Sequence, residues 1–246
     1  RPNGNITRAE AAKMIYVICN GGVDDGAEMF KGSNTFQDTR ENAWYEGYIE
    51  YCYATGIVAG RGNDVNTGKP IFDPEANVTG YELAKMLLVV AEYDPIAETF
   101  TGENWTANVM KHARLSGLSD NYSVLMSAAA PRQWASLMIS NLITEVYVAE
   151  YVGDMLVTNT RLAGNTHLVG AARMGLVIEE GIVMETPTLK FGGGTHEGTN
   201  SVIARRVSNS QSQYYGTYLK GETEVDLSHT MTIGYDIPNK FLGKEA

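Results

Sequence analysis

The stretch "NITRAEAAKMI", residues 5–15, returns in altered form as "NVTGYELAKML", residues 77–87, which lies 72 positions further along the chain. Asparagine, threonine, glutamate, alanine, lysine and methionine recur in register, whereas Gly80 stands where the first copy has Arg8. Self-similarity at such a spacing indicates a supersecondary unit stacked on copies of itself. The repeat therefore predicts a fold built from similar helical units.

Both copies begin with the pattern of a helix N-terminus. Thr7 with Glu10, and Thr79 with Glu82, have capping-box spacing, in which the threonine oxygen accepts from the glutamate amide and the glutamate accepts from the threonine amide. Arg8 takes no part in such a cap, and at the first helical position a cation meets the positive end of the helix dipole. Two interpretations of Arg8 stay open: an anion-binding residue, or a surface arginine with an acidic neighbour.

A second element also recurs. The stretch "ENAWYEGYIEYCYATGIVAG", residues 41–60, corresponds to "GENWTANVMKHARLSGLSD", residues 102–120, with Trp44 opposite Trp105. Each unit is therefore expected to consist of one helix, a loop rich in glycine, asparagine, aspartate and proline, and a second helix.

The first helix of the more complete unit is predicted to start near Asn42 or Ala43 and to stop at Gly56, where glycine permits a left-handed cap. Cys19 and Cys52 each lie in an apolar helical pattern. Two cysteines do not make a disulfide framework, and buried free thiols are the favoured interpretation over a bridge.

A looser third copy is "AAAPRQWASLMISNLI", residues 128–143. Aligned on its methionine, it places Arg132 opposite Arg8 and Pro131 where the capping threonine stood. Proline is tolerated at the start of a helix, so the helix is expected without the capping box. A shift of one residue is the alternative alignment, and it would lose the arginine match.

Composition limits the classes of function. The chain has 246 residues, of which 43% are hydrophobic and 20% charged, as is ordinary for a soluble globular protein. No apolar run reaches the length of a membrane span, and no signal-peptide pattern opens the sequence. The formal charge of −10 argues against nucleic acid as a partner. It also means that an anionic ligand would have to be held by a few local cations.

Together these motifs resemble the S-layer homology family. The resemblance rests on "FQDTRENAWYEGYIEYCYATGIVAG…IFDPEANVTGYELAKML" as one nearly complete repeat, preceded by "RPNGNITRAEAAKMI" as the second half of another, and covers roughly residues 1–145. It implies three repeats around a pseudo-threefold axis, with a central helical bundle and grooves between the lobes. The implied activity is non-covalent binding of a secondary cell-wall polysaccharide, often one that ends in a pyruvylated sugar. Such binding would hold a secreted protein in the extracellular cell wall or S-layer.

The resemblance assigns ligand contact to Arg8, Asp38, Trp44, Gly60 and Gly62, and Arg132 is a further candidate in the third copy. A guanidinium at a helix start can bind a carboxylate bidentately while nearby amides help. An aspartate can accept from sugar hydroxyls, an indole offers an apolar face, and glycines allow close approach of the backbone.

Two of these assignments have structural alternatives. Trp44 is equally explained by core packing, and Asp38 by a turn or helix start. Because Gly80 lacks the arginine, the expectation is one competent groove near Arg8, a silent groove near Gly80 and an undecided one near Arg132.

The predicted fold class is α+β, with a mostly α-helical pseudo-threefold repeat module followed by a β-rich C-terminal segment. Runs such as "SVIARRVS", "QYYGTYL" and "TMTIGYDI" indicate strands, and "KFGGGTHEGTNS" a hairpin tip rather than a phosphate loop. The predicted segments are 1–35 as the second half of repeat one, 36–92 as repeat two, 93–147 as a degenerate repeat three, 148–180 as a helical connector, and 181–246 as the start of a β-rich surface-layer body. A chain that appears cut at both ends is expected to be a fragment of a larger protein.

No catalytic or metal-binding motif of the G-x-S-x-G, H-E-x-x-H or cysteine–histidine type occurs, so neither an enzyme nor a cofactor or metal is expected. The expected partners are the wall polysaccharide and copies of the same protein in a surface lattice. The alternative is the anchor portion of a cell-surface enzyme or adhesin whose active domain lies outside this chain.

Overall fold

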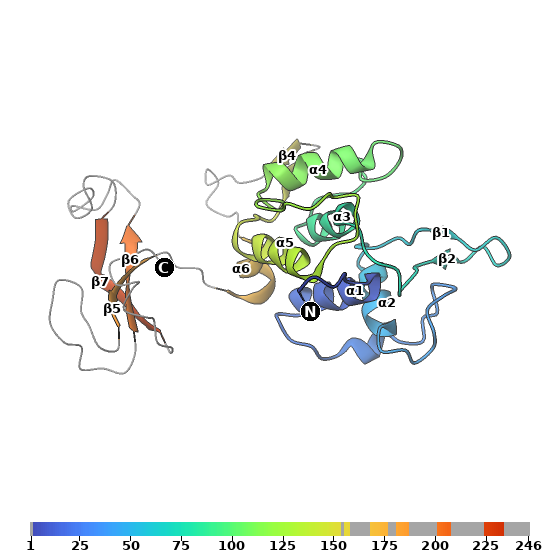
Figure 1. Cartoon of the computed structure of the whole chain (residues 1–246), viewed down its shortest axis with the longest axis horizontal. Coiled ribbons are helices and arrows are strands. Elements are labelled where there is room, and N and C mark those ends of the chain that lie inside the picture. The colour runs from blue at the N-terminus through green and yellow to red at the C-terminus, as the bar shows by residue number, and fades with distance from the viewer. Residues whose placement is uncertain are drawn as a thin grey trace. The chain divides into compact units, whose positions relative to one another are not determined.

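The computed structural model describes residues 2–153, 155–157, 168–176, 181–186, 201–207 and 224–233. The chain forms two compact units, Arg1–Val177 and Ile178–Ala246 (Figure 1).

The first unit is helical, with two short antiparallel strand pairs. Its described elements are α1 (Arg8–Cys19), the 3₁₀ helix η1 (Ala27–Phe30), α2 (Glu46–Ala54), β1 (Gly62–Asn63), β2 (Pro70–Ile71), α3 (Gly80–Val90), α4 (Trp105–Leu115), α5 (Arg132–Thr144), β3 (Glu150–Val152), β4 (Met155–Val157) and α6 (Val169–Met174). Helix α1 packs against α2 and α3, and α3 packs in turn against α4 and α5 (Figure 1). The helix-rich fold expected from the repeats is thus confirmed.

The segments that lead into α1, α3 and α5 join in a closed ring of hydrogen bonds. The amide of Ile6 donates to the carbonyl of Ala130 (3.1 Å), that of Ala130 to Val78 (2.8 Å), and that of Val78 back to Ile6 (3.1 Å). These three apolar side chains are themselves fully buried. A cyclic pattern of this kind is what three repeats around a pseudo-threefold axis would produce.

The helix starts also decide between the two alignments of the third copy. Arg8, Gly80 and Arg132 are each the first residue of their helix, after Thr7, Thr79 and Pro131 as N-caps. The alignment that pairs the two arginines is therefore correct.

Both predicted capping boxes are formed. The amide of Thr7 donates to Glu10 (2.8 Å), and the amide of Glu10 donates to the Thr7 hydroxyl oxygen (3.2 Å). Thr79 and Glu82 repeat this exchange at 2.9 and 3.2 Å. The proline at the start of α5 makes no side-chain cap, as expected.

We expect Thr79→Ala to lower the free energy of unfolding of the helical unit by about 1 kcal/mol, because one amide at the start of α3 loses its acceptor. The measurement is urea unfolding followed by circular dichroism at 222 nm. Ser136→Ala, an exposed serine within α5, is the matched control and should leave stability nearly unchanged. An equal loss in both variants would contradict the capping role.

Helix α2 starts later than the sequence pattern predicts, at Glu46 rather than near Asn42 or Ala43. Asn42 has a φ of +62°, a left-handed conformation that cannot open a right-handed helix. Its amide donates to the Glu46 carboxylate (2.6 Å), which fixes the preceding turn. The helix ends at Ala54 with Thr55 as its C-cap, and Gly56, whose φ is +75°, follows in the expected left-handed conformation.

The two cysteines are free thiols, as the apolar pattern around them predicts. Cys52 is fully buried, and its thiol points toward the carbonyl of Ala12 (3.6 Å). Cys19 is half-buried. Burial raises the pKa of both thiols above the ordinary cysteine value, so both stay protonated and unreactive at neutral pH.

In the second unit, β5 (Gly181–Glu185), β6 (Ser201–Val207) and β7 (Glu224–Ile233) form an antiparallel sheet in the order β5-β6-β7. The strands expected from "SVIARRVS" and "TMTIGYDI" correspond to β6 and to the end of β7. Residues 187–200, 208–223 and 234–246, including "QYYGTYL" and most of the glycine-rich segment, lie outside the described residues. The larger β-rich body therefore stays a prediction.

The range 148–180, predicted as a helical connector, holds the β3–β4 pair as well as α6. In the part of the chain that the structure describes, no helix is long and apolar enough to cross a membrane.

Candidate functional site

A pocket of about 310 Å³ opens beside the N-terminus of α1, and we call it the Arg8 pocket. The residues of its wall that carry chemical function are Arg8, Gly60, Arg61, Glu82, Lys85 and Trp105. They come from α1, from the loop after α2, from α3 and from the start of α4, so the pocket lies where all three repeats contribute.

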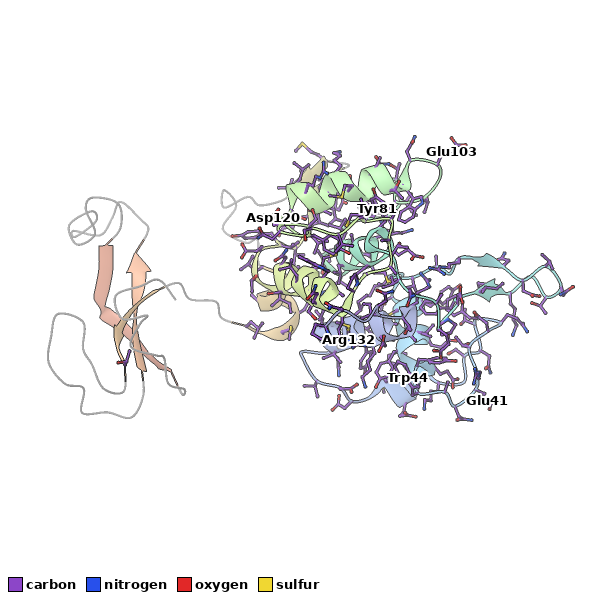
Figure 2. All side chains as sticks on the ribbon, viewed as in Figure 1. Glu41, Trp44, Tyr81, Glu103, Asp120 and Arg132 are labelled. Atoms are coloured by element: carbon purple, nitrogen blue, oxygen red, sulfur yellow. The ribbon has the colours of Figure 1, made fainter. Side chains whose placement is uncertain are left out.

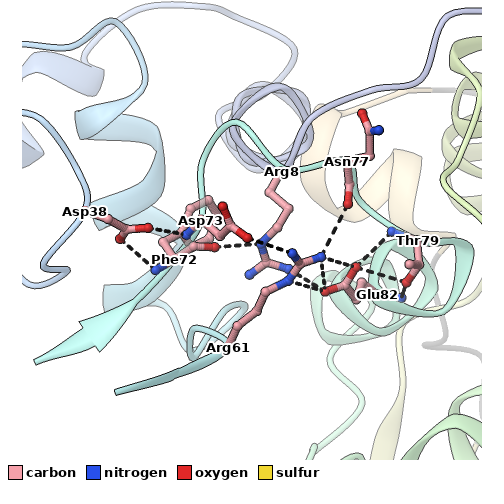
Figure 3. A network of polar contacts seen from close by, with 8 residues as sticks. All are labelled: Arg8, Asp38, Arg61, Phe72, Asp73, Asn77, Thr79 and Glu82. Atoms are coloured by element: carbon pink, nitrogen blue, oxygen red, sulfur yellow. Dashed lines mark hydrogen bonds and ion pairs between the residues drawn. The ribbon is translucent and has the colours of Figure 1, made fainter. Parts of the chain in front are cut away.

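Arg8 forms the buried base of this pocket. Its residue surface is only 3% exposed. Its Nε donates to the carbonyl of Phe72 (2.7 Å), its Nη1 donates to Oε1 of Glu82 (2.9 Å), and its guanidinium carbon lies 4.6 Å from the centre of the Phe72 ring (Figure 3). Burial lowers the pKa of Arg8 while Glu82 opposes that shift. Arginine stays charged even so, and its charge is balanced by the glutamate.

Arg61 holds the same glutamate from the solvent side. Its Nε and Nη2 donate to the two carboxylate oxygens of Glu82, each at 2.9 Å, and its Nη1 lies 3.0 Å from Oδ2 of Asp73 (Figure 3). The Arg61 side chain is 33% exposed. Two arginines thus share one glutamate, which removes most of the negative potential that Glu82 would otherwise place in the pocket.

Lys85 supplies a further cation. Its ammonium lies 5.6 Å from the centre of the Trp105 ring. Burial lowers the pKa of Lys85, and the neighbouring Arg8 lowers it further. Among the described residues no carboxylate forms an ion pair with Lys85. A positive charge without a partner, next to an aromatic face, suits a ligand that combines an anionic group with an apolar sugar face.

Gly60 is required where it stands. Its φ is +85°, and a Cβ at this position would lie 2.7 Å from the carbonyl oxygen of Ile71. The close approach brings the following residue, Arg61, over α3. Gly62, the other glycine assigned by resemblance, lies in β1 and is not among the residues lining the Arg8 pocket.

Asp38 lies behind the pocket and supports it. Its two carboxylate oxygens accept from the amides of Phe72 (2.9 Å) and Asp73 (2.6 Å). These bonds fix the segment that supplies the carbonyl acceptor of Arg8 (Figure 3). This geometry favours the turn interpretation of Asp38 over contact with sugar hydroxyls.

Trp44 and Arg132, labelled in Figure 2, line a second pocket of about 500 Å³. We call it the Trp44 pocket. Trp44 is 51% exposed, which argues against the core-packing interpretation. Arg132 donates from Nη2 to Oε1 of Glu10 (2.8 Å) and its side chain is 45% exposed. Of the predicted site residues, Arg8 and Gly60 therefore line one pocket and Trp44 and Arg132 the other, whereas Asp38 and Gly62 line neither.

The position equivalent to these arginines in the second repeat has no charge. A Cβ on Gly80 would lie 3.0 Å from the backbone of Met126, so a longer side chain would need the chain to move. At the glutamate's position in the third repeat stands Trp134. Both members of the ion pair are thus absent at this position, and the silence of the groove near Gly80 stays a prediction.

Sequence reasoning missed several wall residues of the Arg8 pocket. Lys85, Glu82 and Trp105 were visible as repeated positions, and recurrence in both copies was the signal that could have singled them out as a site. Arg61 has no repeated partner and no motif. Its place depends on how the loop folds back onto α3, which the sequence does not state.

The one histidine whose side chain the structure describes, His112, is paired with a glutamate and offers no catalytic arrangement. His112 is 4% exposed and lies edge-on to the rings of Tyr93 and Phe100. Its Nε2 lies 2.7 Å from a carboxylate oxygen of Glu98. Burial lowers the pKa of His112, and Glu98 partly offsets that shift. A pair packed among aromatic rings is best explained by fold stability.

The other histidines lie outside the part of the chain whose side chains are described. Within that part, no group of three or more histidine, cysteine, aspartate and glutamate residues could hold a metal ion.

The structure thus defines a helical repeat module with pockets between its repeats, and comparison with known proteins identifies the class. Residues 35–84 match the family model of the S-layer homology domain. The chain therefore contains an S-layer homology domain, which is a cell-wall-anchoring domain of cell-surface proteins.

Two relatives match over 121 residues each. An amylopullulanase of Thermoanaerobacterium thermosulfurigenes is 30% identical, over 48% of this chain and 6% of its own length. The exoglucanase XynX of Acetivibrio thermocellus is 27% identical, over 48% of this chain and 11% of its own length. The chain thus corresponds to a small part of each relative. The similarity concerns a domain and does not extend to the whole protein.

Proposed function

We propose that this chain anchors a bacterial surface protein to the cell wall by binding an acidic secondary cell-wall polysaccharide in the Arg8 pocket. The observation that carries the proposal is Lys85, a half-buried cation with no carboxylate partner among the described residues, set beside Trp105. A carboxylate on the polymer, such as that of a pyruvylated sugar, would lie against Lys85 and the outer edge of Arg61.

In this arrangement Arg8 acts mainly by positioning other residues of the pocket and not by direct contact with the ligand. Because it is 3% exposed and already donates to Phe72 and Glu82, it holds the glutamate and adds positive potential from below. The indole of Trp105 would cover the apolar face of the sugar ring. The overall charge of −10 repels a polyanion, so affinity would come from this local cluster and would weaken as salt rises.

Lys85→Ala should weaken binding to purified cell walls by about tenfold to a hundredfold, because a charge-assisted contact with the ligand is lost. The measurement is a co-sedimentation isotherm on walls of the source bacterium, before and after extraction of their secondary polymer. Binding by the wild type should require the polymer. Arg8→Ala is the less informative variant, because it also removes a buried partner of Glu82.

Lys111→Ala is the matched control, since Lys111 is an exposed helical lysine outside the pocket wall. Its isotherm should coincide with that of the wild type. Equal losses in both variants would point to non-specific attraction between lysines and the wall. Undiminished binding by Lys85→Ala would remove the Arg8 pocket as the site.

Two identities of the complete protein fit such an anchor. We favour a non-enzymatic S-layer protein that assembles with copies of itself, located in the extracellular surface layer. The anchor portion of a surface enzyme is the second candidate, and the names of the two relatives, an amylopullulanase and an exoglucanase, support it.

Electron microscopy of the full-length protein distinguishes the two candidates. A two-dimensional lattice would support the S-layer protein, whereas turnover of a polysaccharide by the same preparation without a lattice would support the enzyme.

A further inference from the structure

The Arg8 pocket and the Trp44 pocket are built from the same residues in equivalent places. The Trp44 pocket is lined by Glu10, Lys13 and Met14, and the Arg8 pocket by Glu82, Lys85 and Met86, each 72 positions later. Trp44 and Trp105 occupy equivalent positions before and at the start of a helix, and Arg132 and Arg8 each begin one. The two pockets therefore share one set of residues, but differ in the burial of the arginine and in the groups around the set.

The first difference concerns the lysine. Lys13 forms an ion pair with Asp24, with Nζ 2.7 Å from Oδ2, and the Tyr48 hydroxyl donates to the same carboxylate (2.8 Å). Among the described residues no carboxylate forms an ion pair with Lys85. The aspartate thus compensates the lysine in one pocket and has no counterpart in the other.

The second difference concerns the glutamate. Glu82 accepts from two arginines, Arg8 and Arg61. Glu10 accepts from Arg132 and from the amide of its own cap, and among the described residues no second arginine reaches it. One glutamate is therefore covered by two positive charges and the other by one.

The pairing of the charges consequently differs between the two pockets. In the Trp44 pocket Lys13 pairs with Asp24 and Arg132 with Glu10. In the Arg8 pocket Arg8 and Arg61 pair with Glu82 and Asp73, and Asp38 acts on Arg8 from behind the pocket, whereas among the described residues no carboxylate forms an ion pair with Lys85. The lysine pKa values shift in opposite directions: the hydrogen bond that Lys13 donates to Asp24 raises the pKa of Lys13, whereas burial lowers that of Lys85.

We propose that the two pockets bind chemically different parts of a wall glycan: the Arg8 pocket an anionic substituent, and the Trp44 pocket an uncharged sugar residue. The inference rests on the proposed function, since it divides that binding between two places. The exposed indole of Trp44, with Met14, Val17, Ile18 and Ile139 beside it, supplies an apolar platform for a sugar ring. Asp24 and Glu10 would repel a carboxylate that approached Lys13.

The tryptophans provide a separate reporter for each pocket. The chain has three, and their indole N–H signals in a ¹⁵N-labelled sample can be assigned with tryptophan-to-phenylalanine variants. The probes are sodium glucuronate and glucose, which differ in one carboxylate, titrated at constant ionic strength to about 100 mM. We expect glucuronate to bind about tenfold tighter than glucose at the Trp105 signal, and the two to differ by less than about twofold at the Trp44 signal.

Two variants test whether the unpaired lysine causes the preference for glucuronate. Lys85→Gln should abolish the preference for glucuronate at Trp105. Asp24→Asn should create such a preference at Trp44, because it frees Lys13. Asp25→Asn is the matched control, since Asp25 accepts from Asn20 and makes no ion pair with Lys13. It should leave both signals as in the wild type.

A preference for glucuronate at Trp44 in the wild type would overturn the inference, as would an unchanged response of Asp24→Asn. If neither sugar shifts either indole although the protein still binds polymer-bearing walls, the division between pockets is wrong and the anchor function stands. If wall binding itself does not depend on the polymer, the proposed function fails first.

Discussion

Glu82→Ala should lower the free energy of unfolding of the helical unit by about 3–5 kcal/mol, the loss typical of removing one partner of a buried ion pair. Its carboxylate accepts from Arg8, from Arg61 and from the amide of its own cap residue, Thr79. Without it, Arg8, which is 3% exposed in the intact protein, keeps among the described residues only the carbonyl of Phe72 as an acceptor. The measurement is urea unfolding followed by circular dichroism.

Glu10→Ala provides the matched control, because Glu10 occupies the equivalent position in the first repeat. Its arginine partner, Arg132, has a side chain that is 45% exposed and can return to water when the glutamate is removed. The expected loss is about 1 kcal/mol, mostly from the capping box. Equal losses in the two variants would show that the burial of Arg8 does not set the cost.

The same glutamate should make stability depend on pH. Burial raises the pKa of Glu82, but the Thr79 amide, Arg8 and Arg61 together lower it below the ordinary value of 4.5. A carboxyl with a lowered pKa in the folded state contributes stability that is fully present above pH 4.5 and is lost as pH falls through the folded pKa. Glu82→Gln should therefore show a shallower loss of stability below pH 4.5 than the wild type.

The sequence was sufficient for the parts of the fold that depend on local chemistry. Capping boxes are set by residues three apart, and the left-handed end of α2 at Gly56 is set by a single residue, so both could be predicted. The start of α2 could not, because it depends on Glu46 binding the amides of Asn42 and of Gly32, fourteen residues away. A helical pattern does not report such a contact.

The candidate site, too, combines features that local sequence predicts with features that depend on contacts distant in sequence. The repeat marked Arg8 as unusual, yet its burial is set by the segment around Phe72, which Asp38 holds from a distance of more than thirty positions in sequence. The sequence also did not indicate which charged residues of different repeats pair with one another. Arg132 contacts Glu10 from the opposite end of the module, which only the closure of the ring brings about.

Gly47→Ala should destabilise the helical unit by about 3 kcal/mol, at the upper end of the cost of overpacking. Gly47 lies in the first turn of α2, where that helix packs against η1. A Cβ here would lie 2.0 Å from the carbonyl oxygen of Ala27 and 2.8 Å from its carbonyl carbon. Because backbone rather than a flexible side chain blocks the space, α2 and η1 would have to separate, and urea unfolding should report the loss.

Gly56→Ala separates this steric cost from a conformational one. Gly56 has a φ of +75° but nothing within 4 Å of its Cβ position, so alanine there would pay only for the left-handed backbone, about 1–2 kcal/mol. Gly47→Ala should in addition shift the Trp44 indole signal, because Trp44 lies two residues before the start of α2 and should move with that helix. The prediction would be contradicted if Gly47→Ala lost no more free energy of unfolding than Gly56→Ala and left the Trp44 indole signal unshifted. In that case η1 would move aside while α2, which positions the Trp44 pocket, stayed in place.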